Sequence, residues 1–296
     1  MSRRRKHRKS RKRLTYGIIT VAFILICIVT YSYLHSSNQN PPNPHPPNQL
    51  PSKAAIVDHL SLTAPNQTFK NSSISILEAA GFDVTYYPGK DVTVNFYRNL
   101  VSHNYGLIVF RVHSAIIGNS TRLGLFTSEL FDENKYNTPS APYYDDIVNA
   151  KPQRIVKAYF PDDPIQYFAI APEFIEKYGN FQNTTIIMMG CDGIKYNAMA
   201  EAFRRKGAKI CIGWDGLVSA PHTDHGTTCL LQHLAQGETV AEAVTETMKA
   251  VGPDPEYESR LKHYPGAAGS YTIQSIIYGA FSTILIRANT MWAKEQ

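Results

Sequence analysis

Three nearly continuous apolar runs set the strongest limit on how this chain folds. They are Gly106 to Val112 (GLIVFRV), Ile186 to Gly190 (IIMMG) and Lys209 to Gly213 (KICIG). Runs of this length without polar alternation are typical of strands buried on both faces, as in parallel sheets covered by helices. The sequence therefore predicts an open, mostly parallel sheet.

The segments around these runs have helical patterns and stop signals. Tyr196, Met199, Ala200 and Phe203 share one helical face, and Gly207 suits the end of that helix, which predicts a strand-helix-strand crossover. Thr239 to Glu242 has the pattern of a capping box that opens another helix. The remaining elements expected early in the body are strands at Ala54 to Asp58 and Phe82 to Tyr86, and helices at Phe69 to Ala80 and Val94 to Ser102. Together they predict an α/β domain with helices on both faces of the sheet.

The first fifty residues predict on which side of a membrane the domain lies. Residues 1–13 hold nine Lys/Arg, and residues 14–34 then run without a charge for about 31 Å as a helix, enough to span a bilayer. The positive-inside rule places the basic tail in the cytoplasm and the rest outside, and no small-x-small cleavage site follows the span. Residues 35–52, rich in Pro and Asn, predict a stalk of up to about 50 Å. We therefore expect a single-pass membrane protein with an extracytoplasmic domain at 53–296.

The charge of the body argues against nucleic acid as a partner. The whole chain has a net charge of +6, but residues 51–296 hold 21 Lys/Arg against 24 Asp/Glu. The basic pI belongs to the tail, and a phosphate-binding surface must lie on the folded part.

Two other features concern the exported state. Four Asn-x-Ser/Thr sites, at Asn66, Asn71, Asn119 and Asn183, predict a glycoprotein. Of the four cysteines, Cys27 lies in the expected span, so Cys191, Cys211 and Cys229 leave at least one thiol outside without an intramolecular partner.

A thiol and an imidazole follow two of the buried strands. His113 comes directly after GLIVFRV, and Cys191 comes directly after IIMMG. The carboxyl ends of parallel strands meet at one edge of a sheet, so these side chains are expected there together. A helix starting near Ile194 would favour the Cys191 thiolate through its dipole. The pair predicts nucleophilic catalysis, with His113 as acid and base.

The order His113-Ser114 followed by Gly190-Cys191-Asp192-Gly193 resembles the caspase-like (clan CD) cysteine peptidases, above all the CHAT-type and gingipain-type members. The resemblance extends over roughly residues 54–250 and implies an endopeptidase with a thioacyl intermediate, a peptide or protein substrate and no cofactor. It further implies that backbone N–H groups of Ser114, where the family has Gly, and of Cys191 hold the oxyanion. Members often select a residue through a charged pocket, so Trp214 and Asp215 are candidate substrate-binding residues, with Asp215 favouring Arg or Lys.

Three alternatives remain. An amidotransferase-like hydrolase would pair Cys191 with a later histidine, His222 or His225. Those histidines, with Asp224 and His233, are also a weak candidate metal set, since H-x-x-H suits one helix face poorly. The non-enzymatic alternative is an anchored extracellular binding or receptor module.

The stretch from Ser114 to Thr185 gives few signals. Leu123 to Thr127 and Arg154 to Phe160 are candidate strands, and residues 131–153 are expected to form an exposed excursion. Pro253 to Ser270 is expected to form a second loop beside the site.

Overall fold

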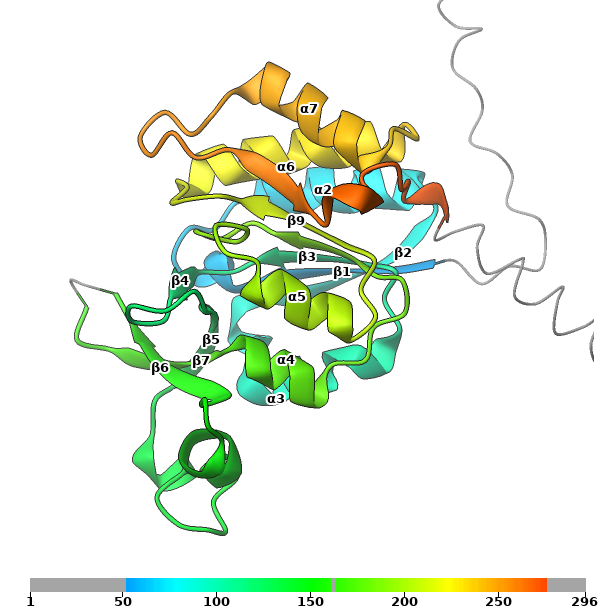
Figure 1. Ribbon diagram of the computed structural model, residues 1–296. Coiled ribbons are helices and arrows are strands. Elements are labelled where there is room, and N and C mark those ends of the chain that lie inside the picture. The colour runs from blue at the N-terminus through cyan, green and yellow to red at the C-terminus, as the bar shows by residue number, and fades with distance from the viewer. Residues whose placement is uncertain (1–51, 161–162, 276–296) are drawn as a thin grey trace, which may run out of the picture. The chain divides into compact units, whose positions relative to one another are not determined.

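The computed structural model describes residues 52–160 and 163–275 (Figure 1). The expected tail, membrane span and almost all of the stalk lie outside the described residues. Between residues 52 and 275, apart from 161 and 162, no helix is both long and apolar enough to cross a membrane.

The centre of the domain is a six-stranded sheet with the order β10-β9-β8-β3-β1-β2. Its strands are β1 (Ser52–Asp58), β2 (Phe82–Pro88), β3 (Leu107–Arg111), β8 (Thr185–Met188), β9 (Ile210–Trp214) and β10 (Leu261–Tyr264). All neighbours are parallel except β10, which pairs antiparallel with β9 at the edge. Every residue of β3, β8 and β9 is buried, as the three apolar runs predict.

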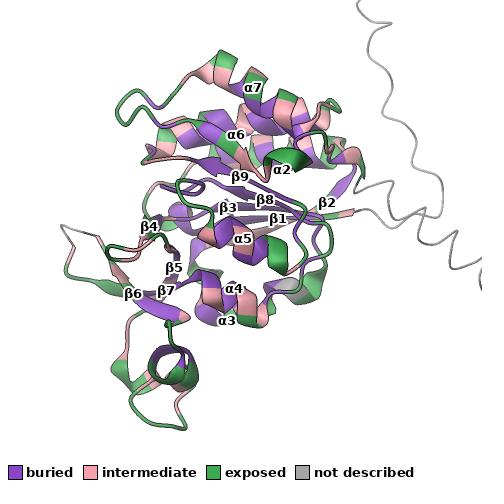
Figure 2. Ribbon diagram, viewed as in Figure 1, coloured by how far each residue is buried: buried purple, intermediate pink, exposed green. Residues whose placement is uncertain are grey.

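Helices cover both faces of this sheet (Figures 1 and 2). One face carries α2 (Gln67–Ala79), α6 (Ala220–Ala235) and α7 (Val240–Val251), and the other carries α3 (Val94–Asn99), α4 (Pro172–Tyr178) and α5 (Ala198–Arg205). Successive strand residues alternate between the two cores: Val109 packs with the first set of helices and Phe110 with the second. The α/β class and the helices on both faces are thus confirmed.

Local signals fix several helix ends. The capping box at Thr239 is present, with the Thr239 hydroxyl accepting from the Glu242 amide and the Glu242 carboxylate accepting from the Thr239 amide. After α5, Gly207 has φ = +100°, and a Cβ there would overlap the Phe181 carbonyl oxygen. Glycine is therefore needed at that turn.

A second, antiparallel sheet follows β3, and the sequence predicts it only in part. Its order is β4-β5-β7-β6, formed by β4 (Ser114–Ile116), β5 (Leu123–Leu130), β7 (Gln166–Ile170) and β6 (Ile155–Tyr159). Both candidate strands of this region are present, and β7 and β4 are additional. The short helical turns of the domain are His59–Leu62, Gly89–Asp91, Leu100–His103, Glu133–Lys135, a π-helix at Asp145–Asn149, and Gly266–Ala268.

Residues 131–153 form the expected exposed excursion over most of their length, but Tyr143, Asp146, Ile147 and Ala150 are buried. Asp146, in the π-helix, is buried and binds Arg98, Arg154 and the Tyr178 hydroxyl. Tyr143 is buried beside it, so an ion-pair cluster and an aromatic contact with Phe168 anchor this segment.

Candidate active site

The His113 and Cys191 segments meet at the carboxyl edge of the central sheet. β3 and β8 are hydrogen-bonded neighbours, with Phe110 opposite Met188. Beyond them, the Ser114 hydroxyl donates to the Cys191 carbonyl oxygen at 2.7 Å. Gly190 packs so tightly that a Cβ there would overlap Ser114 Oγ and the Val112 carbonyl oxygen. The main chains that carry the imidazole and the thiol are therefore in direct contact.

Aromatic rings and one hydroxyl surround the His113 imidazole. Its Nε2 shares a hydrogen bond with Thr63 Oγ1 at 3.0 Å. The ring lies edge to face with Phe160 at 4.8 Å between centroids and with His59 at 5.7 Å. Burial, and then the nearby charge of Arg111, lower the pKa of His113 below its usual 6.5. At neutral pH the ring is uncharged and can accept a proton.

The Cys191 thiol is half-buried and lies against the main chain before α6. Sγ is 3.5 Å from the Val218 amide nitrogen and 3.6 Å from the Val218 carbonyl oxygen. Burial raises the pKa of Cys191, the Val218 amide partly offsets this, and the Asp192 carboxylate raises it further. Among the described residues, no hydrogen bond joins Sγ to the His113 ring.

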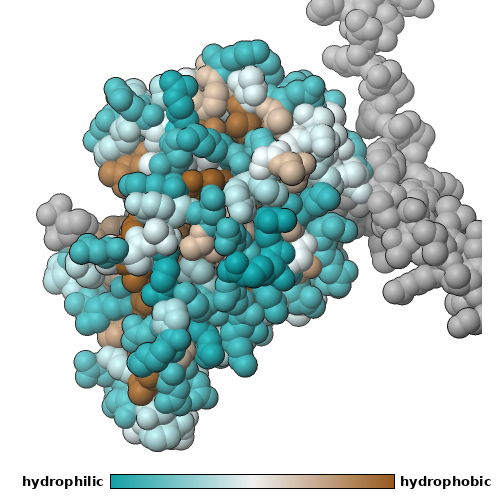
Figure 3. Space-filling model, viewed as in Figure 1, coloured by the Kyte–Doolittle hydropathy of each residue, from teal (hydrophilic) through white to brown (hydrophobic). Residues whose placement is uncertain are grey.

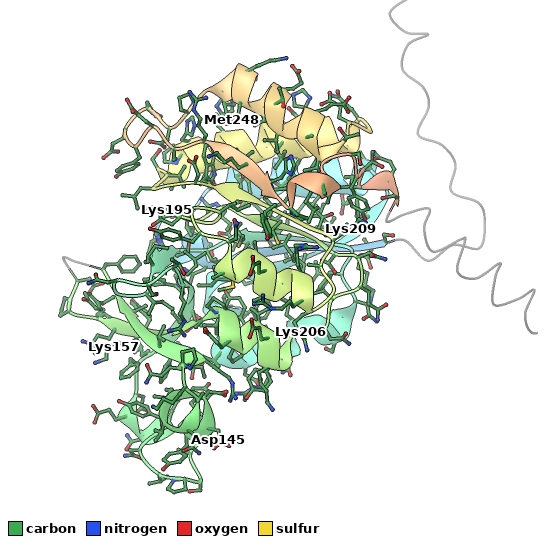
Figure 4. All side chains as sticks on the ribbon, viewed as in Figure 1. Asp145, Lys157, Lys195, Lys206, Lys209 and Met248 are labelled. Atoms are coloured by element: carbon green, nitrogen blue, oxygen red, sulfur yellow. The ribbon has the colours of Figure 1, made fainter. Side chains whose placement is uncertain are left out.

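The expected helix dipole at Cys191 is absent, so that prediction is wrong. Residues 191–197 form turns, with Asp192 at φ = 59°, and α5 begins only at Ala198. The Asp192 and Ile194 amides bond to the carbonyl oxygens of Gly216 and Trp214. Lys195, on this loop (Figure 4), pairs with Asp192 at 3.1 Å. The field of a helix end decays within its first turn, so it does not reach the thiol.

The two candidate substrate-binding residues have internal partners. Trp214 is 0% exposed, and its indole N–H donates to Thr223 Oγ1 at 2.9 Å. Asp215 accepts from the Arg260 amide and pairs with Lys262, each at 2.7 Å. Trp214 thus offers no surface to a substrate in this structure, and the Asp215 charge is already neutralised.

A buried ion cluster that was not predicted from the sequence lies directly behind His113. Arg111 is 0% exposed and binds Asp58 at the end of β1 and Asp224 on α6, at 2.7 Å each. It also donates to the Ala64 carbonyl oxygen. Asn66 completes the cluster, because its side chain donates to Asp224 and caps α2. The signal was an arginine inside an apolar strand, but its partners are far away in the sequence.

A second missed residue, Asp254, organises the loop beside Cys191. Its buried carboxylate accepts four hydrogen bonds, from the amide and hydroxyl of Ser219 and from the amides of Glu256 and Tyr257. This ties the loop before β10 to the start of α6. The second loop expected at Pro253 to Ser270 is interrupted by β10 and by the helical turn at Gly266–Ala268.

The later histidines serve other purposes. His222 lies against Trp214 and contacts the Gly252 carbonyl oxygen at 3.2 Å, while His233 pairs with Glu238. Asp224 is committed to Arg111. Within residues 52–160 and 163–275, no three His, Cys, Asp or Glu side chains are grouped to hold a metal ion. Cys191, Cys211 and Cys229 are all free thiols.

The fold and this edge define an α/β protein with a mostly parallel sheet and a histidine and a cysteine on adjoining strand ends. The sequence matches no known family model, and no curated protein matches it.

Proposed function

We propose that this protein is a cysteine endopeptidase of the caspase-like type, with Cys191 as nucleophile and His113 as general acid and base. The observation that carries the proposal is the 2.7 Å bond from Ser114 Oγ to the Cys191 carbonyl oxygen, which joins the two strand ends. The resting protonation states favour a general-base mechanism over a preformed ion pair, because the thiol pKa is raised and the imidazole pKa is lowered.

Each proton in this mechanism passes through His113. The imidazole accepts the thiol proton while Sγ bonds to the scissile carbonyl carbon, and it returns that proton to the amine nitrogen as the C–N bond breaks. Water then loses a proton to His113 and attacks the thioester, and the departing sulfur takes the proton back. Because Nε2 of His113 is hydrogen-bonded to Thr63, we assign the proton transfers to Nδ1. No cofactor enters these steps.

One movement precedes the chemistry. Sγ now contacts the Val218 amide and carbonyl, so the side chain must rotate away from Val218 toward the imidazole. The lost contact is weak, because sulfur is a poor hydrogen-bond partner. The backbone N–H groups of Cys191 and Ser114 are the proposed oxyanion donors.

The proposal includes the location of the domain at a membrane. An uncharged span at 14–34 behind nine cations would anchor the domain at an outer membrane surface, with the active edge presented to peptides or proteins there. Asn71, Asn119 and Asn183 are exposed and open to glycosylation in that compartment. Asn66 already caps α2 and binds Asp224.

Labelling by a peptidyl acyloxymethyl ketone tests the proposal. The full chain is treated with a panel of such probes, and the adduct is located by mass spectrometry. We expect labelling at Cys191, its loss in Cys191→Ala, and a drop of about 100-fold in His113→Ala, the lower range for a positioned base. Cys229→Ala is the matched control, since Cys229 is a free, half-buried thiol on α6. Labelling that survives Cys191→Ala, or that ignores His113, contradicts the mechanism.

A second candidate is a binding module without catalysis. It is favoured by the resting contacts, in which Sγ and the imidazole bond to Val218 and Thr63 instead of to each other. That candidate predicts that Cys191→Ala leaves partner binding intact and that no peptidyl probe reacts faster than iodoacetamide.

A further inference from the structure

Two exposed apolar side chains lie on the loops around Cys191. Leu217 is 47% exposed and directly precedes Val218, whose amide and carbonyl contact Sγ. Tyr257 is 42% exposed, and its amide donates to Asp254, whose carboxylate also accepts from the amide of Ser219, the residue after Val218. Large apolar groups left in water beside a reactive atom are candidates for substrate contact.

The loops that present these side chains are held firmly. The Ser259 hydroxyl donates to the Leu217 carbonyl oxygen at 2.6 Å, and the Tyr257 amide donates to the buried Asp254 at 2.9 Å. The Gly216 carbonyl oxygen accepts from the Asp192 amide. Both side chains therefore stand on backbone tied to the Cys191 turn and to α6, and a substrate meets a preorganised surface.

Three carboxylates near the thiol already have ionic or hydrogen-bond partners. Asp192 pairs with Lys195, Asp215 pairs with Lys262, and Asp254 accepts four hydrogen bonds while buried. An incoming Arg or Lys side chain would compete with these partners for the three carboxylates. An apolar side chain needs no counter-charge.

In Figure 3, hydrophobic surface gathers along the left side of the view, over the loops between β9 and α6 and over β4 and β5. The rest of that face is mostly hydrophilic. Part of the exposed apolar surface thus lies at the strand-end edge that carries the two segments of the site.

We infer that the substrates carry a large apolar side chain, such as Leu or Phe, on the residue whose carbonyl carbon Cys191 attacks, and that this side chain packs against Leu217 and Tyr257. The inference rests on the proposed peptidase function. It replaces the expectation that Asp215 selects Arg or Lys.

Four peptidyl acyloxymethyl ketones, identical except for Leu, Phe, Arg or Asp at the carbonyl-bearing residue, test the inference on the full chain. We expect the Leu and Phe probes to label Cys191 at least about tenfold faster than the Arg and Asp probes, the lower range of discrimination by a hydrophobic site. Leu217→Ala and Tyr257→Ala should each reduce that ratio and leave the iodoacetamide rate unchanged. Leu130→Ala is the matched control. Leu130 is 59% exposed and ends β5, whereas the residues of β5 that pair with β4 are at the other end, Leu123–Leu125.

The outcomes separate the two proposals. Fastest labelling by the Arg probe, with loss of that preference in Asp215→Asn, overturns the apolar assignment and leaves the peptidase mechanism standing. Equal rates for all four probes also overturn it. If no probe labels Cys191 in a manner that depends on His113, while iodoacetamide still reacts, the proposed function fails and the substrate inference fails with it.

Discussion

His59 gives the sharpest stability test of this structure. It directly follows β1, is 3% exposed, and its ring lies 5.7 Å from that of His113. Burial, followed by the charge of His113, lowers the pKa of His59 from 6.5 to about 4, although a bond to the Thr127 backbone works in the opposite direction. Its Nδ1 is buried without a hydrogen-bond partner. The folded protein therefore holds His59 in the neutral form.

The sign and size of the pH effect follow from linkage. Below pH 6.5 the unfolded chain binds a proton at His59 while the folded chain does not, so stability is lost as the pH falls toward 4. With pKa values of 6.5 unfolded and about 4 folded, the loss is about 2 kcal/mol at pH 5 and about 3 kcal/mol at pH 4, relative to pH 8.

Urea denaturation of the full chain and of His59→Gln, followed by tryptophan fluorescence, measures this effect. Trp214 is buried and reports unfolding of the central sheet. Glutamine does not titrate, so the free energy of unfolding should fall by about 2 kcal/mol less in the variant between pH 8 and pH 5. The contributions of all other titratable groups, which the two proteins share, cancel in this difference. Equal pH dependence in both proteins would refute the buried, neutral assignment of His59.

Three further predictions concern the same edge. Arg111→Met should cost about 3–5 kcal/mol in urea denaturation, because it leaves two buried carboxylates without their cation; a cost below 1 kcal/mol would contradict the cluster. The rate of His113-dependent labelling should rise with pH through a midpoint below 6.5, since neutral His113 is the base and its pKa is lowered; a midpoint above 7 would contradict this. Gly190→Ala should abolish labelling while circular dichroism shows the fold retained, because the new Cβ would push Ser114 and its Cys191 contact apart; unchanged labelling would contradict that packing.

The central sheet was predictable because local sequence patterns mark its strands and the helices beside them. Continuous apolar runs, a capping box at Thr239 and a glycine stop at Gly207 each act over fewer than ten residues, and each is confirmed. The second sheet has weaker signals. β4 has only three residues, and β5 pairs with β7 through a bulge, so no clear alternation marks either strand. The short α4 begins at Pro172 and shows less than two full turns of pattern.

For the candidate site, the sequence allowed us to predict which strand ends meet, but not the directions of the side chains. Parallel strand order brings the His113 and Cys191 segments to one edge, which patterns in the sequence can indicate. Side-chain directions depend on distant partners. The contact of Cys191 with Val218 spans 27 residues, and that of Arg111 with Asp224 spans 113. No local pattern specifies such pairs, and the failed dipole prediction at Cys191 shows the same limit, since it depended on the exact start of α5.

Arg111 connects the architecture of this edge to its chemistry. Its guanidinium joins the end of β1 to α6 through Asp58 and Asp224, and the same charge, two residues before His113, adds to burial in keeping the imidazole neutral. Replacing the cluster with apolar groups of equal volume would hold the elements together as well or better, as such exchanges often do. The positive charge of Arg111 would be lost too, which should raise the His113 pKa, but burial, the larger cause, would keep it below 6.5. Arg111 therefore does two things at this edge: it joins β1 to α6, and after burial it is the second cause of the lowered pKa of His113.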